Sequence, residues 1–502
     1  MKTLPRLSTL LLASALLATP ALSAELRIGL ADDADVLDPA QSRTFVGRIV
    51  YTAMCDKLVD VSPDLKIVPQ LATEWNWSAD GKELTMKLRE GVKFHDETPL
   101  DAAAVVATIE RNMTLPESRR KSELSSVEKV EAIGDYEVKF TLKAPDVTLL
   151  AQLSDRAGMI VSPTAAKELG ADFGSKPVCA GPFKFVERVQ QDRIVLEKFA
   201  DYWDKDKVFI DKVTYLPIPD STVRLANLRS GELDMIERLA ATDAASVKSD
   251  AALTYADVVG IGYMAMYVNV ANGPRSDNPF GKDKRLRQAF SLAIDREALS
   301  QVVFEGTAMA GNQPYPPTSP WFNKEIPVPV RDIAKAKELM KAAGHETLDI
   351  QLQHANSPVV TQMMQVVQSM VAEAGFNVSL KATEFATLLS EQSAGNFQLS
   401  RSDWSGRIDP DGNLHQFVTC ECGINDAKYC NAEVDKLLNE ARASADEAVR
   451  KQKYDAAAKI LDDDLPVIYL GHPSWIWAIK KEVTGFVPSP DGMIRLLGVK
   501  KG

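Results

Sequence analysis

Residues 348–401 alternate between strand-like and helix-like patterns, and this alternation limits the fold more than any other feature of the chain. The strand-like segments show short apolar alternation, whereas the helix-like ones repeat apolar residues every three or four positions. Strands separated by helices in this way form a parallel layer of an α/β fold. The expected order is a strand at 348–353 (LDIQLQ), a helix at 360–374, a strand at 376–382 (FNVSLKA), a helix at 385–394 and a strand at 397–401 (FQLSR).

The loops that follow strands of an α/β sheet are the first candidates for a binding site, because ligands bind beyond the carboxyl ends of the strands. Three loops qualify: DDADVLDP (32–39), HANSP (354–358) and DWSGRIDPDGN (403–413). Trp404 and Arg407 stand out, since a surface loop has little use for tryptophan and a half-buried arginine needs an anionic partner. The candidate ligand-binding residues of these loops are Asp32, Asp33, His354, Asn356, Trp404, Arg407 and Asp409.

The length and the N-terminus indicate an exported protein of more than one lobe. A chain of 502 residues is too long for a single compact core. Residues 1–24 have the pattern of a secretory signal peptide, with two basic residues, an apolar run and small residues, and we expect cleavage between 21 and 24. No later stretch approaches the roughly 20 apolar residues of a membrane span, so direct membrane insertion is not expected.

Charge and motifs argue against several classes of function. Without its two basic signal residues the chain carries 56 − 69, or −13, which gives no electrostatic footprint for nucleic acid. The segment DPDGN has its glycine at the fourth position rather than the sixth of a calcium loop, and no nucleophile elbow occurs. We therefore predict no metal, no cofactor and no catalytic site. Asp409 and Asp411 could serve acid–base chemistry in a secreted hydrolase, but the Pro and Gly that follow them favour turn formation.

The five cysteines are consistent with an oxidising compartment. Cys420, Cys422 and Cys430 lie close enough for one small disulfide, which would stabilise the fold by roughly 3 kcal/mol in the chain-entropy model. A zinc site is the less favoured alternative, because the spacing lacks the paired motif of structural zinc. Which of these cysteines pair, and whether Cys55 and Cys179 do, stays open at this point.

Several strings together resemble the extracellular solute-binding proteins of family 5, which include the dipeptide-, oligopeptide- and nickel-binding proteins of ABC importers. The resemblance extends in order over nearly the whole chain after the signal, and the block at 69–102 is highly specific. It rests on LDPA (37–40), PQLATEWNWSADGKELTMKLREGVKFHDETPLDA (69–102), CAGPFKFVE (179–187), ADYWDKDK (200–207), RLANLRSGELD (224–234), RLRQAFSLAIDREAL (285–299) and KAKELMKAAG (335–344).

The resemblance implies a two-lobed clamshell, the type II architecture of periplasmic binding proteins. Such a receptor is a monomer in the periplasm that delivers a small molecule or short peptide to an inner-membrane ABC permease. The boundary between lobes is expected near YMAMYVNVANGPRSDNPFGK (263–282), where an apolar strand gives way to Gly, Pro and Asn. Lobe I would then take 25–268 and 480–502, with an extra subdomain at roughly 45–180, and lobe II would take 269–479.

The resemblance also bears on the ligand. Peptide-binding members carry an aspartate for the peptide ammonium after a tryptophan like Trp404, and the matching position here is Arg407; Asp409 would serve only after a two-residue slip. Arg407 therefore predicts an anionic group on a peptide-like solute, while a nickel complex or an opine-like compound is the alternative. The family's small disulfide loop favours Cys420–Cys430. Further candidate contacts are Arg43 and Arg156 in lobe I and Tyr263 and Tyr267 in the strand near the hinge, where core packing is an equal alternative for the tyrosines.

Overall fold

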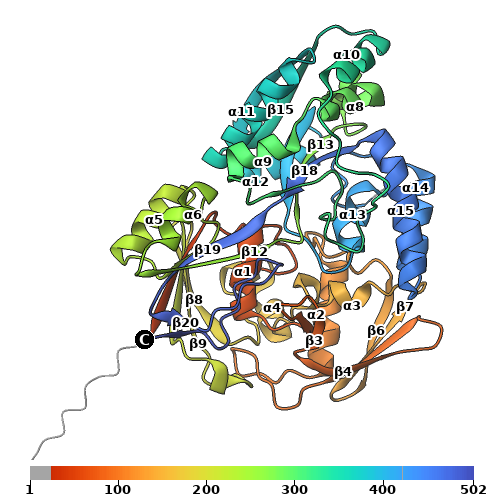
Figure 1. Ribbon diagram of the computed structural model, residues 1–502. Coiled ribbons are helices and arrows are strands. Elements are labelled where there is room, and N and C mark those ends of the chain that lie inside the picture. Colours follow the sequence, from red (N-terminus) through yellow and green to blue (C-terminus); the bar gives the residue numbers. More distant parts are fainter. Residues whose placement is uncertain (1–23, 421) are drawn as a thin grey trace, which may run out of the picture.

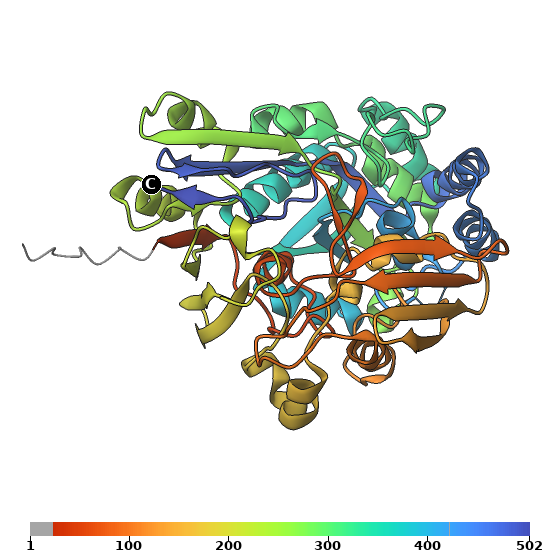
Figure 2. The same ribbon diagram turned by 90° about the horizontal axis from the view of Figure 1, so that it is seen from below.

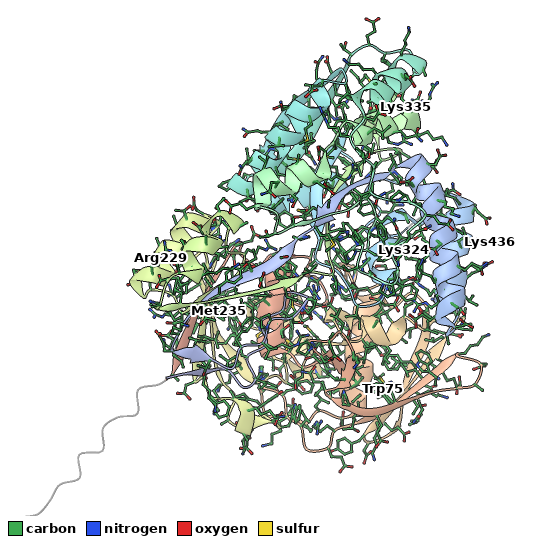
Figure 3. The ribbon with its side chains drawn as sticks, in the orientation of Figure 1. Trp75, Arg229, Met235, Lys324, Lys335 and Lys436 are labelled. Atoms are coloured by element: carbon green, nitrogen blue, oxygen red, sulfur yellow. A yellow bond between two sulfur atoms is a disulfide. The ribbon has the colours of Figure 1, made fainter. Side chains whose placement is uncertain are left out.

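The computed structural model describes residues 24–420 and 422–502 as two lobes joined by two crossing segments (Figure 1). Residues 1–23, which hold nearly all of the expected signal peptide, lie outside the described part. Within the described part, no helix combines the length and the apolar character needed to cross a bilayer. Met235 lies in the interior of the first lobe, whereas Lys335 and Lys436 project from the surface of the second (Figure 3).

Lobe I, residues 24–259 and 474–502, is built on a seven-stranded mixed sheet in the order β12-β19-β11-β1-β10-β9-β8. The first strand, ELRIGL, pairs in parallel with β10 and β11, and its alternate apolar side chains are fully buried. The strands are β1 (Glu25–Leu30), β8 (Phe183–Val189), β9 (Arg193–Lys198), β10 (Lys212–Pro217), β11 (Met235–Ile236), β12 (Leu253–Val259) and β19 (Ser474–Lys480), and the helices are α1 (Phe45–Met54), α5 (Ser221–Ser230) and α6 (Ala244–Lys248).

A separate four-stranded antiparallel sheet, in the order β4-β5-β7-β6, forms a subdomain beside this sheet (Figure 2). It has its own hydrophobic core, in which Leu84, Val105 and Phe140 are fully buried. This subdomain lies inside the 45–180 stretch expected for it. Its elements are the short pair β2 (Val59–Val61) and β3 (Ile67–Pro69), β4 (Ala72–Trp77), β5 (Glu83–Leu88), α2 (Ala102–Thr114), β6 (Val127–Gly134), β7 (Glu137–Leu142) and α3 (Leu149–Gln152). Helix α4 (Pro163–Leu169) and the short pair of β20 (Val483–Thr484) with β21 (Lys500–Lys501) pack on the core of the seven-stranded sheet.

Lobe II, residues 263–472, confirms the strand–helix–strand–helix–strand prediction. Its sheet has the order β14-β18-β13-β17-β15-β16, in which β15 runs parallel to both β16 and β17. Helix α11 buries Met364, Val367 and Val371 against one face, the stripe expected from the sequence. The elements are β13 (Tyr263–Val268), α7 (Pro279–Lys282), α8 (Lys284–Leu292), α9 (Arg296–Phe304), β14 (Met309–Ala310), α10 (Ile333–Ala342), β15 (Leu348–Ala355), α11 (Pro358–Ala372), β16 (Phe376–Thr383), α12 (Phe385–Ser393), β17 (Leu399–Trp404), α13 (Asp411–Val418), α14 (Ala432–Arg442), α15 (Glu447–Asp464) and β18 (Val467–His472).

The chain crosses between the lobes earlier than expected, at residues 260–262 and again at Pro473. Strand β13 pairs with β17 and β18 inside lobe II, so the boundary does not fall at 268/269. Strand β19 pairs with β11 and β12 inside lobe I, so the return does not fall at 479/480. The two crossings lie side by side, since the Gly260 amide donates to the Pro473 carbonyl at 3.0 Å. The Gly- and Pro-rich stretch after 268 is a loop of lobe II, and the hinge itself lies between two consecutive strands.

Gly262 in the first crossing is expected to tolerate no larger residue. A Cβ atom there would lie 2.0 Å from the Trp404 carbonyl oxygen, which is fixed by the pairing of β13 with β17. Gly262→Ala should therefore lower the free energy of unfolding by about 2–3 kcal/mol, the cost of forcing a side chain into filled space. Denaturant unfolding measures this loss, with Gly423→Ala as the control, because a Cβ there meets no atom within 4 Å and the backbone lies outside the left-handed region. Equal losses in the two variants would contradict a packing origin.

The described residues form two disulfides, one local and one between distant parts of the fold. The Cys420–Cys430 bond that the family resemblance implied is confirmed, and it closes the loop between α13 and α14. Cys55 and Cys179, whose pairing the sequence left open, also form a disulfide, which ties the end of α1 to the segment before β8. Of the five cysteines, all within the described part, only Cys422 remains a thiol.

Candidate functional site

The loop that follows β17 is held in shape by Asn413 of α13. The Asn413 amide oxygen accepts from the Trp404 indole nitrogen at 2.9 Å and from the Arg407 backbone amide at 2.7 Å. Its amide nitrogen donates back to the Arg407 carbonyl at 2.9 Å. The Arg407 guanidinium lies over the Trp404 ring, 4.3 Å from its centroid, in a cation–π contact. Trp404 and Arg407 therefore form one unit.

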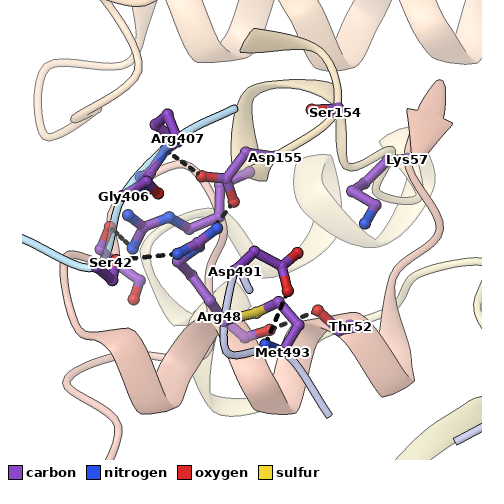
Figure 4. Close-up of polar contacts among 12 residues, drawn as sticks. Ser42, Arg48, Thr52, Lys57, Ser154, Asp155, Gly406, Arg407, Asp491 and Met493 are labelled. Atoms are coloured by element: carbon purple, nitrogen blue, oxygen red, sulfur yellow. Dashed lines mark hydrogen bonds and ion pairs between the residues drawn. The ribbon is translucent and has the colours of Figure 1, made fainter. Parts of the chain in front are cut away.

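Arg407 faces lobe I and meets the carboxylate of Asp155 there (Figure 4). Its Nε lies 2.7 Å from Asp155 Oδ2, while Nε of Arg48, on helix α1, donates to the other oxygen at 3.0 Å. Arg48 also reaches across to lobe II, where its Nη1 donates to the Ser405 hydroxyl at 3.0 Å. A single carboxylate of lobe I is thus shared between arginines of both lobes.

Positive charge exceeds negative charge around Asp155. Burial alone would raise the pKa of Asp155, but the charges of Arg407 and Arg48 hold it well below its usual range. Burial and the neighbouring charge of Arg48 lower the pKa of Arg407 to about 9, and burial with neighbouring arginines lowers that of Arg156 to about 10. Two guanidinium groups contact the Asp155 carboxylate and the charge of Arg156 adds to theirs, an arrangement that favours the arrival of a further anion.

The depressed pKa of Asp155 gives a testable pH dependence. A carboxyl group with a lowered folded pKa stabilises the fold above its unfolded pKa, about 3.9, and this stabilisation is lost as the pH falls further. The wild type should therefore lose stability between pH 5 and pH 3 more steeply than Asp155→Asn, which has no charge to lose. Thermal unfolding midpoints across this range measure the difference. Parallel curves for the two proteins would show that the Asp155 charge does not stabilise the fold.

A cavity opens beside this cluster between the lobes, at the first crossing. The room inside it for the centres of water molecules is about 20 Å³, and the total is about 380 Å³ when the open mouth and the gaps between atoms are counted. Its polar lining comes from both lobes and includes the Arg48 and Arg407 side chains, so a solute there would touch both halves of the clamshell. Other lining residues are Asp155, Ile261, Gly406 and Asp491.

A second polar patch in lobe I includes the predicted residue Asp32. Its carboxylate lies 3.2 Å from Arg238 Nη1, and the Arg238 guanidinium lies 4.9 Å from the centroid of the Phe45 ring. Phe45 and Trp475 stack in parallel with their centroids 4.5 Å apart. Burial lowers the pKa of Arg238, but the charges of neighbouring carboxylates, including Asp403 of lobe II, raise it overall. A half-exposed ion pair on an aromatic stack is a surface able to contact a ligand.

Three more candidate ligand contacts of lobe I, Arg43, Arg156 and Asp33, bind different partners. Arg43 reaches lobe II, with Nη1 donating to the Ser393 hydroxyl at 3.1 Å. Arg156 is buried and donates to the Ser42 carbonyl at 2.9 Å, so it acts on the site through its charge rather than by contact. Asp33 forms an ion pair with Arg188 within lobe I at 3.1 Å. Of these three residues, only Arg43 links the two lobes.

Several expected ligand contacts in lobe II have other roles. Asp409 accepts from both terminal nitrogens of Arg450, at 2.9 and 2.7 Å, so its carboxylate is occupied within lobe II and does not face the cavity. Tyr263 and Tyr267 are buried, with their hydroxyl groups 3.2 Å apart, which agrees with the core-packing alternative. His354 is buried against the carbonyl of Ala355, and Asn356 is exposed at the carboxyl end of β15.

Sequence reasoning missed Arg48 and Asp155, which complete the cluster around Arg407. Arg48 is the one charged residue of helix α1, whose other buried side chains are apolar or small, and a lone charge in an apolar helix was a usable signal. Asp155 directly precedes Arg156, which was a candidate ligand contact, but the sequence around Asp155 contains no pattern that indicates a binding role. Among residues 24–420 and 422–502, no three His, Cys, Asp or Glu side chains are arranged to hold a metal ion.

A family model and known relatives match most of this chain. The model of the bacterial extracellular solute-binding proteins, family 5 middle region, matches residues 66–425. The glutathione-binding protein GsiB of Pectobacterium atrosepticum is 30% identical over 470 residues, which cover 91% of this chain and 90% of that protein. The di/tripeptide-binding protein 1 of Pseudomonas aeruginosa is 28% identical and covers 87% of this chain and 86% of its own length.

Solved structures show the same two-lobed fold. The periplasmic binding protein AgaA from Agrobacterium tumefaciens R10, in complex with agropinic acid, superposes with a TM-score of 0.87 at 27% identity, over 95% of this chain and 99% of its own. The dipeptide-binding protein of a Pseudoalteromonas species, in complex with Met-Leu, superposes with a TM-score of 0.88 at 24% identity, over 95% of this chain and 100% of its own. The second likeness concerns the fold alone.

Proposed function

Because the chain belongs to the bacterial extracellular solute-binding proteins of family 5, we propose that it captures a peptide-like solute with an acidic group between its lobes. The solute is then handed to an inner-membrane ABC permease. The observation that carries this proposal is the carboxylate of Asp155 held between Arg407 of lobe II and Arg48 of lobe I. Two guanidinium groups that already bind one carboxylate across the cleft are suited to bind another.

The physical mechanism is a shift in the equilibrium between open and closed lobes. A solute carboxylate that contacts Arg407 and Arg48 together is bound fully only when the lobes are closed. Hydrogen bonds to charged groups contribute roughly 1.5–3 kcal/mol each, so one bidentate contact can shift such an equilibrium strongly. In this proposal the acidic group of the solute shares the arginines with Asp155, and the positive charge of Arg156 offsets the added negative charge.

The relatives narrow the solute class. Their names specify glutathione, di- and tripeptides, and agropinic acid. All of these compounds carry carboxylate groups, which fits the excess of guanidinium groups in the cleft. Nickel-binding relatives also share the fold, one of them solved with a nickel–histidine complex at 20% identity. A nickel complex would have to bring its own ligands, because the described residues offer no three-ligand metal group.

Calorimetric titration of the mature protein against a panel of solutes tests this function. The panel contains reduced glutathione, di- and tripeptides, agropinic acid and nickel with histidine. We expect one-to-one binding of an acidic organic solute, recovered unaltered as judged by mass spectrometry. Turnover of the solute would contradict a receptor and support a secreted hydrolase, while binding of the nickel complex alone would overturn the proposed solute class.

A further inference from the structure

The loop between α13 and α14 places the thiol of Cys422 next to one ring nitrogen of His415, and the other ring nitrogen of that histidine contacts Asn439. Cys422 is partly exposed, and its sulfur lies 3.8 Å from Nδ1 of His415 and 2.9 Å from the hydroxyl of Thr419. The other ring nitrogen of His415, Nε2, lies 3.0 Å from the amide oxygen of Asn439. His415 is 6% exposed on α13 and Asn439 lies on α14, so two helices hold the imidazole in place.

This geometry defines which nitrogen can take the proton of the thiol. An amide oxygen only accepts hydrogen bonds, so Nε2 of His415 carries a proton and Nδ1 is left as the acceptor facing the sulfur. A nucleophile, a base within reach and a third group that orients the base are the parts of an activated cysteine. None of these three residues lines the interlobe cavity, so the proposed capture of a solute does not use them.

The charges around the pair favour the ionised form. Burial lowers the pKa of His415, but the charge of Asp411 and the contacts with Cys422 and Asn439 raise it overall. Burial raises the pKa of the Cys422 thiol, but the contacts with His415 and Thr419 lower it overall. Among the residues that the structure describes, two more charged groups act here: Arg442, which is paired with Asp411 at 2.6 Å, and Asp435, which accepts from the Cys420 amide at 3.1 Å.

We propose that Cys422 is a modification site whose thiol, activated by His415 and Asn439, exchanges with small-molecule disulfides. The Cys422 thiolate attacks one sulfur of the disulfide, a new bond joins Cys422 to that half, and the old sulfur–sulfur bond breaks. The other half leaves as a thiolate and takes the proton held on His415. No net oxidant is needed, because the small disulfide itself is reduced as Cys422 is oxidised. The Cys420–Cys430 disulfide stays intact.

Incubation of the mature protein with oxidised glutathione tests this site. We expect a single adduct, mapped to Cys422 by peptide mass spectrometry, that forms at pH 6 at least tenfold faster than on an unstructured peptide with one cysteine. His415→Gln should slow the reaction at pH 6 at least tenfold, and this loss should shrink as the pH rises toward the pKa of the unaided thiol. Asn439→Ala should show a smaller loss of the same kind.

Two further measurements keep the test independent of folding. Non-reducing peptide maps of each variant check that Cys420–Cys430 remains paired, and the wild-type rate of alkylation by iodoacetamide against pH reports the thiol without any substitution. A wild-type alkylation profile that rises only near the ordinary thiol pKa of about 8.5 would overturn the proposal. So would an adduct on Cys420 or Cys430, or an unchanged rate at pH 6 in His415→Gln.

Discussion

Replacing Arg407 by alanine is expected to weaken binding of an acidic solute at least tenfold, which corresponds to about 1.4 kcal/mol. The substitution removes a guanidinium that faces the cleft and leaves only Arg48 to bridge a solute carboxylate. The fold should tolerate the change, because Asp155 keeps its hydrogen bond from Arg48 at 3.0 Å. Calorimetric titration with the solute identified in the panel measures the loss. The affinity of Arg407→Lys should lie between those of the wild type and Arg407→Ala, since an ammonium group keeps the positive charge but cannot form the two parallel hydrogen bonds of a guanidinium.

Two controls separate recognition of the anion from general damage. Arg331 is a half-buried arginine elsewhere in lobe II, paired with Glu373 at 2.9 Å, and Arg331→Ala should leave affinity unchanged. The second control is the solute with its carboxylate converted to a carboxamide. The wild type should bind this analogue weakly, and Arg407→Ala should affect it little. An equal loss for the acid and its amide would mean that Arg407 acts on lobe closure and not on the anion.

The sequence predicted the architecture of lobe II well, because its local patterns and its tertiary structure agree. The apolar stripe of α11 and the alternating strands around it describe the buried faces directly. The lobe boundary was less predictable. Glycine and proline after Val268 looked like a linker, yet the crossing at 260–262 joins two strands, and the assignment of β13 depends on its pairing with β17. Local composition does not predict such pairing between segments that are distant in the sequence.

The residues of the candidate site were likewise predictable where local sequence determines their role and unpredictable where distant partners determine it. Trp404 and Arg407 could be selected from the residue types of one loop, and the structure brings them together through Asn413. Asp155 could not be selected, because its role comes from two arginines that are distant in sequence. Asp409 was a candidate from the same loop as Arg407, but Arg450, far along the chain on α15, occupies its carboxylate. A loop sequence shows which side chains need partners, and only the fold shows which partners they find.

The ion pair between Asp411, at the end of this loop, and Arg442 of α14 is the one whose loss should cost most stability. Asp411, which the turn pattern around it marked as structural, is 1% exposed at the start of α13 and accepts from Nη2 of Arg442 at 2.6 Å and from Nε at 3.1 Å. Asp411→Ala leaves Arg442 without its partner in a low-dielectric setting, which typically costs about 3–5 kcal/mol. The free energy of unfolding in denaturant should fall by about this amount, with an unchanged m-value if the native state stays compact.

A double substitution distinguishes the ion pair from the packing around it. Replacing a buried ion pair by apolar residues of similar volume is often neutral, so Asp411→Leu combined with Arg442→Met should regain most of the stability that Asp411→Ala loses. Asp277, which is 76% exposed beside Lys282, provides the surface control, and Asp277→Ala should leave the unfolding midpoint unchanged. If the double variant were as unstable as Asp411→Ala, the loss would come from the shape of the loop and the first turn of α13, and the unpaired charge of Arg442 would not be its cause.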